Sequence, residues 1–311
     1  MSNILIIKHG SLGDLIQANG AIKEIKNNFP KEKVFLLTTP PYADFMSSCP
    51  FLDGVLIDKR LPRWNLFYLH RLKSMLNRFS FTKIFDLQNS SRSKFYKKFL
   101  FSNKIFWSDS SSFISKEQSI EEKKLPVLDR MELQLNRAGI YEVVHTKKPD
   151  LAWSIKNIKN IINQNFEGNY ILIFPFSSSK LLKKRWPYYD QLISLLRKEY
   201  GKKYNIAIAP GPNEIEQAKK FNANVILNNN KALNIIELVS LIKNSSYVIS
   251  NDTGPAHISA HVKSKGLVLF GSHTTPEKVS METENFKSIT VKNLKDLKPN
   301  EVLNKIKQEL N

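Results

Sequence analysis

A stretch of eight residues in the second half of the chain, Ser-Asn-Asp-Thr-Gly-Pro-Ala-His at 250–257, has residue types that suit phosphate binding. It follows an apolar run and leads into an apolar segment with helical spacing, so it predicts a strand, a tight turn and a helix start. The unpaired N–H groups and the positive end of such a helix favour an anion. Asp252 and Thr253 can cap the helix or contact a ligand. Gly254 permits close backbone approach and Pro255 suits a first helical turn. A capped helix without a ligand fits the same residues.

A second junction of this kind lies near the N-terminus. The apolar run 3–8 is followed by His-Gly-Ser-Leu-Gly-Asp at 9–14 and then by apolar residues at helical spacing. Two such junctions suggest a ligand held between two domains. The Gly10-x-x-Gly13 pair differs from the dinucleotide fingerprint G-x-G-x-x-G. The end of the next strand also lacks a suitably placed acidic residue. Both observations disfavour a nicotinamide-binding domain.

Polar segments follow three further predicted strands. Residues 177–185 contain three hydroxyls and four cations, a composition that suits a pyrophosphate. Glu214 and Glu216 can cap the next helix or bind a ribose hydroxyl, capping being expected for at least one. Residues 88–94 are polar and basic. Solvated loops would have the same compositions.

The chain alternates short apolar runs with helical patterns almost throughout. This alternation predicts an α/β protein with two parallel sheets, each covered by helices on both faces. The expected strands are 3–8, 33–38, 54–57, 83–87, 103–107, 169–174, 204–209, 224–228, 246–250 and 266–270. The expected helices are 13–28, 64–79, 130–138, 188–200, 213–221, 234–243, 254–262 and 300–310. Residues 108–126 are expected to form an exposed loop, and a linker near 147–150 gives domains 1–150 and 151–311.

Composition limits the function classes. The 311 residues carry a formal net charge of +19, and residues 59–104 hold twelve basic residues but one acid, Asp86. This favours a polyanionic partner, namely nucleic acid, an anionic membrane or a phosphorylated glycolipid, although an AT-rich genome would also enrich lysine. No nucleic-acid-binding motif is evident. One cysteine, a start unlike a signal peptide and the lack of an 18-residue apolar run predict a soluble intracellular protein.

The segment 63–79 has an amphipathic pattern. Its apolar face is expected to pack against the N-terminal sheet, or else to contact a membrane surface. The residues expected on that face are Trp64, Tyr68, Leu72, Met75, Leu76 and Phe79.

Several motifs occur together in the order and spacing of glycosyltransferase family 9. They are Ile4–Lys8 followed by Gly-x-x-Gly-Asp, Asp86-Leu87-Gln88, Lys184-Arg185-Trp186-Pro187, Gly211-Pro212-x-Glu214-x-Glu216, Asp252-Thr253-Gly254-Pro255-x-His257 and Leu269-Phe270-Gly271-Ser272-x-x-Thr275-Pro276. The chain thus resembles the ADP-heptose:lipopolysaccharide heptosyltransferases and their relatives. The resemblance implies a GT-B fold, with two Rossmann-like doubly wound domains facing a central cleft, an acceptor-binding domain first and a nucleotide-sugar-binding domain second.

The resemblance also implies an inverting, metal-independent and cofactor-independent transfer of heptose from ADP-heptose to an anionic lipid-linked saccharide, at the cytoplasmic face of the inner membrane. Asp14 matches the general base, and Lys184 matches the lysine that neutralises the leaving diphosphate. The expected donor-binding residues are Ser177, Ser178, Lys184, Glu214, Glu216, Asp252, Thr253, Gly254, Pro255 and His257. The expected acceptor-binding residues are Gly13, Gln88, Arg92 and Lys94.

This sequence departs from the family pattern at residues 9–11, at the serines 177–179, at Arg185 and at Asn19-Gly20. These departures leave the donor sugar and the acceptor open. A related transferase with another nucleotide-sugar donor and a cell-surface glycan acceptor, and a non-catalytic basic binding protein, are the alternatives.

Overall fold

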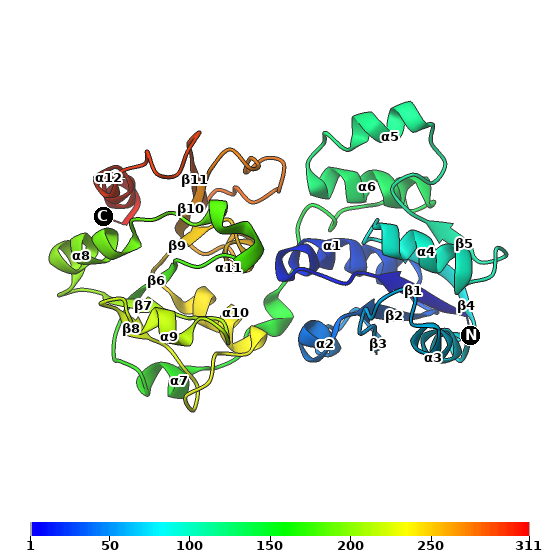
Figure 1. Cartoon of the computed structure of the whole chain (residues 1–311), viewed down its shortest axis with the longest axis horizontal. Helices are drawn as coiled ribbons and strands as arrows, with labels where there is room; N and C mark the ends of the chain where they lie inside the picture. The colour runs from blue at the N-terminus through cyan, green and yellow to red at the C-terminus, as the bar shows by residue number, and fades with distance from the viewer. Residues whose placement is uncertain (1, 311) are drawn as a thin grey trace. The chain divides into compact units, whose positions relative to one another are not determined.

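The computed structural model describes residues 2–310, apart from the side chains of Ser179 and Lys180, and it divides into two compact units (Figure 1). The first unit ends at Trp153 and the second begins at Ser154. Among the described residues, every pair of named strands in both units is parallel, and one isolated antiparallel bridge joins Asn228 and Lys231 in the second unit. The expected α/β class with two parallel sheets is therefore confirmed.

The first unit has a five-stranded sheet in the order β3-β2-β1-β4-β5, with helices on both sides of it (Figure 1). Its strands are β1 (Asn3–Ile7), β2 (Lys33–Thr38), β3 (Gly54–Ile57), β4 (Phe81–Asp86) and β5 (Phe106–Ser108). Its helices are α1 (Leu12–Asn28), α2 (Pro40–Ser47), α3 (Leu66–Asn77), α4 (Ser91–Phe99), α5 (Lys116–Glu122) and α6 (Val127–Arg137).

The chain reverses its direction of progress across this sheet at β1, because β2 and β3 lie on one side of β1 while β4 and β5 lie on the other. Ligands of open α/β sheets bind at such a switch point, beyond the carboxyl ends of the strands. Side chains bridge the gap here: Lys8 Nζ donates to the Leu87 carbonyl at 3.0 Å, and the His9 N–H donates to Gln88 Oε1 at 2.8 Å. The segments after β1 and β4 are therefore joined by hydrogen bonds.

Helix α3 shows how the sequence selects a buried face. Leu69, Leu72 and Leu76, spaced three and four residues apart, pack against β1, β2, β4 and α4 in one apolar cluster. Trp64 was expected on this face, but its side chain is 80% exposed. The reason is that the helix begins only at Leu66, after Asn65 accepts a capping hydrogen bond from the Tyr68 N–H, so Trp64 lies outside the helical spacing.

The second unit has a six-stranded sheet in the order β11-β10-β9-β6-β7-β8 (Figure 1). Its strands are β6 (Tyr170–Phe174), β7 (Asn205–Ile208), β8 (Asn224–Val225), β9 (Tyr247–Asn251), β10 (Gly266–Phe270) and β11 (Phe286–Thr290). Its helices are α7 (Lys159–Asn163), α8 (Tyr189–Tyr200), α9 (Ile215–Ala218), α10 (Ile235–Asn244), α11 (Gly254–His261) and α12 (Pro299–Leu310). Short 3-10 helices span Ala152–Ser154 and Ser179–Lys184.

The switch point of this sheet lies between β6 and β9. The buried Asn251 side chain joins the segments on either side of this point. Its Nδ2 donates to the Pro175 carbonyl at 2.9 Å, and its Oδ1 accepts from the Trp186 N–H at 3.0 Å. Trp186 is itself buried, and its indole N–H donates to the Leu297 carbonyl. The segments that follow β6 and β9 are thereby held together.

Most expected elements are present within a few residues of the expected bounds, but some were missed. Helices α2, α4, α5 and α7 and strand β11 were not predicted, and α5 lies within the expected loop 108–126. Helix α4 has mostly polar residues, of which Ser93 and Tyr96 are the buried ones, so its apolar period is weak. Across residues 2–310, the structure contains no helix with the length and apolarity needed to span a membrane.

The unusual Asn19-Gly20 pair in α1 has a packing explanation. Asn19 is buried and its amide contacts the sulfur of Cys49, a buried free thiol. A Cβ on Gly20 would collide with the backbone carbonyl oxygens of His145 and Thr146. Glycine at this position therefore lets the chain after α6 lie directly against α1.

Replacing Gly20 with Ala tests this close approach, because helix propensity and steric conflict predict opposite changes in the free energy of unfolding. Helix propensity alone would stabilise the protein by about 1 kcal/mol, because alanine is the better helix former. We expect destabilisation by about 1–3 kcal/mol instead, since the backbone must move to admit the methyl group. Urea denaturation measures the change. Asn27→Ala, on an exposed position of the same helix, is the control, and a more stable Gly20→Ala variant would contradict the packing explanation.

Candidate active site

Asp14 lies in the first turn of α1, directly after the loop that follows β1. Its carboxylate accepts hydrogen bonds from the backbone N–H and the hydroxyl of Ser11, at 2.8 and 3.0 Å, and lies 3.8 Å from Lys8 Nζ. Gly10 turns the loop with φ +99°, and Tyr42 occupies the space that a side chain would need. The helix N-terminus and the lysine both favour the ionised carboxylate, which is 41% exposed.

Lys8 and Arg130 are the cations next to this carboxylate. Burial lowers the pKa of Lys8, while the charges of Asp14 and Asp86 oppose the shift. Burial lowers the pKa of Arg130 as well, and Asp14 again opposes it. Both groups therefore depend on nearby negative charge, and a bound anion would supply more of it.

A cavity of about 230 Å³ opens beside these groups, within the first unit. Its lining includes Asp14, Gln88, Lys8, Arg130 and Lys123. Of the four residues expected to bind an acceptor, Gln88 lines this cavity, and Gly13 is buried in the first turn of α1. The lining holds two carboxylates and three cations, and one of the carboxylates, Glu122, is already paired with Arg137. A pocket of this composition suits a hydroxylated ligand that carries negative charge.

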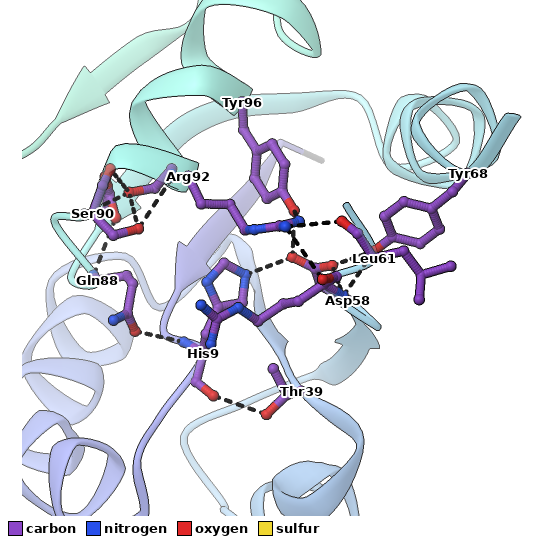
Figure 2. Close-up of polar contacts among 12 residues, drawn as sticks. His9, Thr39, Asp58, Leu61, Tyr68, Gln88, Ser90, Arg92 and Tyr96 are labelled. Carbon is purple, nitrogen blue, oxygen red and sulfur yellow. Dashed lines mark hydrogen bonds and ion pairs between the residues drawn. The ribbon is translucent and has the colours of Figure 1, made fainter. Parts of the chain in front are cut away.

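The fully buried carboxylate of Asp58 anchors the loop that precedes Asp14 (Figure 2). His9 Nε2 lies 2.8 Å from one Asp58 oxygen, the Tyr96 hydroxyl donates to it at 2.7 Å, and the Tyr68 hydroxyl donates to the other. Burial would raise the pKa of Asp58, but the hydrogen bonds from His9, Tyr68 and Tyr96 outweigh it and lower the pKa to about 2. One charge therefore joins the β1 loop to α3 and α4.

Arg92 and Lys94 of α4 were expected to bind an acceptor. The Arg92 guanidinium donates to the Tyr96 hydroxyl and to the Leu61 carbonyl, both at 2.8 Å (Figure 2). Lys94 is exposed on the same helix. Neither lines the cavity beside Asp14. In this structure Arg92 links the loop before α3 to α4, a role that the sequence did not indicate.

In the second unit, three functional groups meet after β6, β9 and β10. Asp252, 3% exposed, accepts from Lys184 Nζ at 2.6 Å and lies 2.9 Å from His273 Nε2. Burial would raise the pKa of Asp252, but the hydrogen bond and charge of Lys184, the charge of His257 and the hydrogen bond to His273 lower it. The group is therefore an ionised carboxylate holding a lysine and a histidine.

His273 is a functional candidate that the sequence motifs did not indicate. It occupies a variable position in the motif Phe270-Gly271-Ser272-x-x-Thr275-Pro276, and the only available signal was its place after a buried strand. Its ring stacks on Phe270 with a centroid separation of 6.2 Å, and its side chain is 5% exposed. The ring is thus held beside Asp252 from two directions.

Helix α11 begins next to this cluster, with Thr253 as its N-cap and Pro255 in its first turn. The Thr253 hydroxyl donates to the Asn251 carbonyl at 3.3 Å instead of capping the helix. His257 lies in the first turns and is nearly buried. The sequence-predicted turn and helix start are therefore present, with the expected charged side chains beside them.

The remaining donor-side candidates occupy two loops. Ser177 is buried with its hydroxyl toward the Leu181 carbonyl, and Ser178 is exposed. Glu214 accepts from the Gly211 N–H at 2.9 Å, so its side chain closes the turn before α9 and makes no capping bond to that helix. Glu216 pairs with Lys219 at 2.7 Å and lines an open cavity of about 490 Å³ in the same unit.

Comparison with known proteins gives the family. The sequence profile of glycosyltransferase family 9 (heptosyltransferase) matches residues 69–307. The chain belongs to glycosyltransferase family 9. It is therefore a glycosyltransferase, and the family expected from the motifs is confirmed.

Relatives of this family 9 enzyme agree in fold. A Haemophilus influenzae protein that is provisionally named a glycosyltransferase is 25% identical over 288 residues, covering 84% of this chain and 80% of its own. The crystal structure of a family 9 glycosyltransferase from Veillonella parvula superposes with a TM-score of 0.77 at 14% identity, covering 99% of this chain and 97% of that one. E. coli heptosyltransferase WaaC with ADP has a TM-score of 0.75 at 18% identity and 99% coverage of both chains, and its complex with ADP-2-deoxy-2-fluoro heptose one of 0.73 at 17%, covering 98% and 99%. These likenesses confirm the expected GT-B fold.

Asp58→Asn tests the buried carboxylate that holds the β1 loop. The amide keeps the volume but removes the charge and directs donors at hydroxyls that are themselves donors. We expect a loss of about 3 kcal/mol in the free energy of unfolding at pH 7, as for other buried networks that lose one partner. Urea denaturation measures it. Asp44→Asn, on the exposed side of α2, should cost less than about 0.5 kcal/mol.

The same pair of proteins gives a pH test. Because the folded pKa of Asp58 is near 2 and an unfolded aspartate titrates near 3.9, its contribution is complete above about pH 4 and is lost as the pH falls toward 2. The wild type should therefore lose more stability than Asp58→Asn between pH 4 and 2. Equal losses would contradict the low pKa.

Proposed function

We propose that this family 9 enzyme transfers a heptose, or a related sugar, from ADP-heptose to a lipid-linked saccharide of the lipopolysaccharide core, with inversion at the transferred carbon. Membership of the heptosyltransferase family supports the sugar class. The fold shared with WaaC, which was solved with ADP and with a fluorinated ADP-heptose, supports the donor class. We assign acceptor binding to the N-terminal domain, residues 1–150, and nucleotide-sugar binding to the C-terminal domain, residues 151–311.

The observation that carries the proposal is the position of Asp14. A general base must be ionised, must reach a substrate hydroxyl and must stay in place during the reaction. Ser11 fixes the carboxylate, the helix N-terminus and Lys8 favour its charge, and it lines a cavity of about 230 Å³. In the proposed reaction Asp14 takes the proton from the acceptor hydroxyl as that oxygen attacks the anomeric carbon.

The departing group is ADP. As the bond between the anomeric carbon and the diphosphate oxygen breaks, its electron pair stays with the phosphate, and negative charge grows there. Lys184 carries three N–H donors, of which Asp252 accepts one, so it can bind Asp252 and a phosphate oxygen together. The start of α11 adds backbone N–H groups and a favourable dipole. These groups supply the charge compensation, so the proposed reaction includes neither a metal nor a cofactor.

The acceptor is proposed to be anionic and attached to lipid. Lys8, Lys123 and Arg130 line the cavity that contains Asp14, and they would pair with phosphate or carboxylate groups on the acceptor saccharide. A lipid-attached acceptor would require the enzyme to work at the cytoplasmic face of the inner membrane. Nucleic acid is not part of this proposal.

The proposal is tested first by Asp14→Asn. Loss of the base should lower turnover by a factor on the order of hundreds, while donor binding is retained, because the amide has nearly the same size. The assay follows ADP release from ADP-heptose with a lipid-linked core saccharide as acceptor. Asp44→Asn is the control. Wild-type turnover in Asp14→Asn would exclude this residue as the base.

Other donors are included in the same assay to test the sugar assignment. UDP- and GDP-linked hexoses should give less product than ADP-heptose. Faster transfer from one of them would retain a family 9 glycosyltransferase but reject ADP-heptose as its donor.

Lys184→Ala tests the donor site. The variant should bind ADP about tenfold more weakly, and transfer should slow further, because the lysine is needed most when the leaving group is charged. Isothermal titration with ADP measures binding. Lys183→Ala, the exposed neighbour, is the matched control. Unchanged ADP affinity in Lys184→Ala would move the phosphate assignment to another cation, with Arg185 the first to test.

A further inference from the structure

The loop before α3 and the first turn of that helix display large apolar side chains to solvent. Trp64, Leu66 and Phe67 are 80%, 75% and 72% exposed. They are distinct from the leucines that α3 packs against the sheet. Contiguous exposed apolar groups of this size commonly mark an interaction surface.

The same region has a strong positive charge. Residues 59–85 contain no Asp or Glu, and the two flanking acids, Asp58 and Asp86, are both buried. The basic residues in that range are Lys59, Arg60, Arg63, Arg71, Lys73, Arg78 and Lys83. Asp58 is already paired with His9 and Tyr96. No acidic residue between 59 and 85 is therefore present to neutralise the exposed cations of that range.

Apolar and basic groups are interleaved in one groove of about 820 Å³ along α3. Ile57, Leu61 and Phe67 line it together with Lys59, Arg71 and Arg78. The Arg71 guanidinium lies over the Phe67 ring at 5.4 Å, so a cation sits at the edge of the apolar surface. This combination matches a phospholipid, which has an apolar chain beneath a negatively charged headgroup.

The apolar side chains are displayed on a fixed frame. The Arg92 guanidinium binds the carbonyls of Arg60 and Leu61, and the Tyr68 hydroxyl binds Asp58 (Figure 2). These bonds secure the loop on one side of Trp64 and the helix on the other. A rearrangement that buried the exposed apolar residues and moved these segments would have to break these bonds, including the partly buried bond from Tyr68 to Asp58.

We propose that the surface formed by Trp64, Leu66, Phe67 and the neighbouring cations docks the enzyme on an anionic phospholipid bilayer, with the three apolar side chains inserted at headgroup level. This inference rests on the proposed function, since it names the surface that would bring the N-terminal domain to a lipid-linked acceptor. The positive charge of the surface favours anionic lipid headgroups. The aromatic and aliphatic side chains favour the boundary between the headgroups and the acyl chains.

Vesicle binding tests the surface. Wild-type protein should co-sediment with vesicles of phosphatidylglycerol and phosphatidylcholine at low salt, at least about tenfold more strongly than with phosphatidylcholine alone, and 0.5 M NaCl should weaken the binding. Trp64 reports insertion directly: its fluorescence should shift to shorter wavelength with anionic vesicles, and this shift should be absent in Trp64→Phe.

Two pairs of variants separate the apolar and charged contributions. Leu66→Ser/Phe67→Ser should lower vesicle affinity at least about tenfold, whereas Tyr141→Ser/Val144→Ser, equally exposed elsewhere in the first unit, should not. Arg71→Glu/Arg78→Glu should lower it similarly, whereas Lys31→Glu/Lys148→Glu, with the same change in net charge, should not. Equal effects of patch and control variants would overturn the proposal. So would self-association that depends on the patch without vesicle binding, because it would assign the patch to a protein contact.

A transfer assay with a deacylated, water-soluble acceptor distinguishes this inference from the proposed function. The patch variants should keep wild-type turnover with that acceptor and lose turnover with acceptor in vesicles. If vesicle binding behaves as expected but no sugar is transferred from ADP-heptose, the proposed function fails and the docking surface stands. If transfer to the water-soluble acceptor proceeds but wild-type protein ignores anionic vesicles, the docking surface fails alone.

Discussion

Parallel strands bring all their carboxyl ends to one edge of a sheet, and in both units the chain reverses its direction of progress at a single pair of neighbouring strands. That geometry leaves a gap between the segments that follow β1 and β4, and another between those that follow β6 and β9. Backbone groups in these gaps cannot pair with a neighbouring strand, so side chains must satisfy them. Lys8 and Gln88 do this in the first unit, and Asn251 does it in the second. The candidate site residues are therefore also the residues that close the fold at each switch point.

Each unit contains a buried aspartate that accepts hydrogen bonds close to its candidate site residues. The Asp58 carboxylate contacts His9, Tyr68 and Tyr96, and the Asp252 carboxylate contacts Lys184 and His273. In both cases burial opposes the charge and hydrogen bonds outweigh it, so the pKa falls. The difference lies in access. The partners of Asp58 are buried or partly buried groups that support the loop before Asp14. Lys184 is partly exposed and can exchange contacts with a ligand.

The sequence predicted the fold well where burial imposes a clear period. Most sheet strands, such as β1, β6 and β10, are apolar runs, and α10 and α12 have strong apolar stripes, so both kinds of element were found. It failed at α4, whose polar composition hides its one buried aromatic, Tyr96, and at the edge strand β11, whose residues after Phe286 are only partly buried. For the candidate site, spacing was enough to select Asp14, Lys184 and Asp252. It could not reveal that Asp58 and His273 support them, because those contacts join residues 49 and 21 positions apart.

The hydrogen bonds to Asp58 also affect which acceptors can react. Tyr68 of α3 and His9 of the β1 loop contact the same carboxylate, so α3 is joined through Asp58 to the loop that precedes Asp14. A first unit seated on a bilayer through α3 would hold the Asp14 carboxylate at a constant height above the lipid. The saccharide stem between the lipid and the reactive hydroxyl would then have to span that height. Such an enzyme would discriminate among acceptors by the length of the saccharide between the lipid and the reactive hydroxyl, in addition to the acceptor's charge.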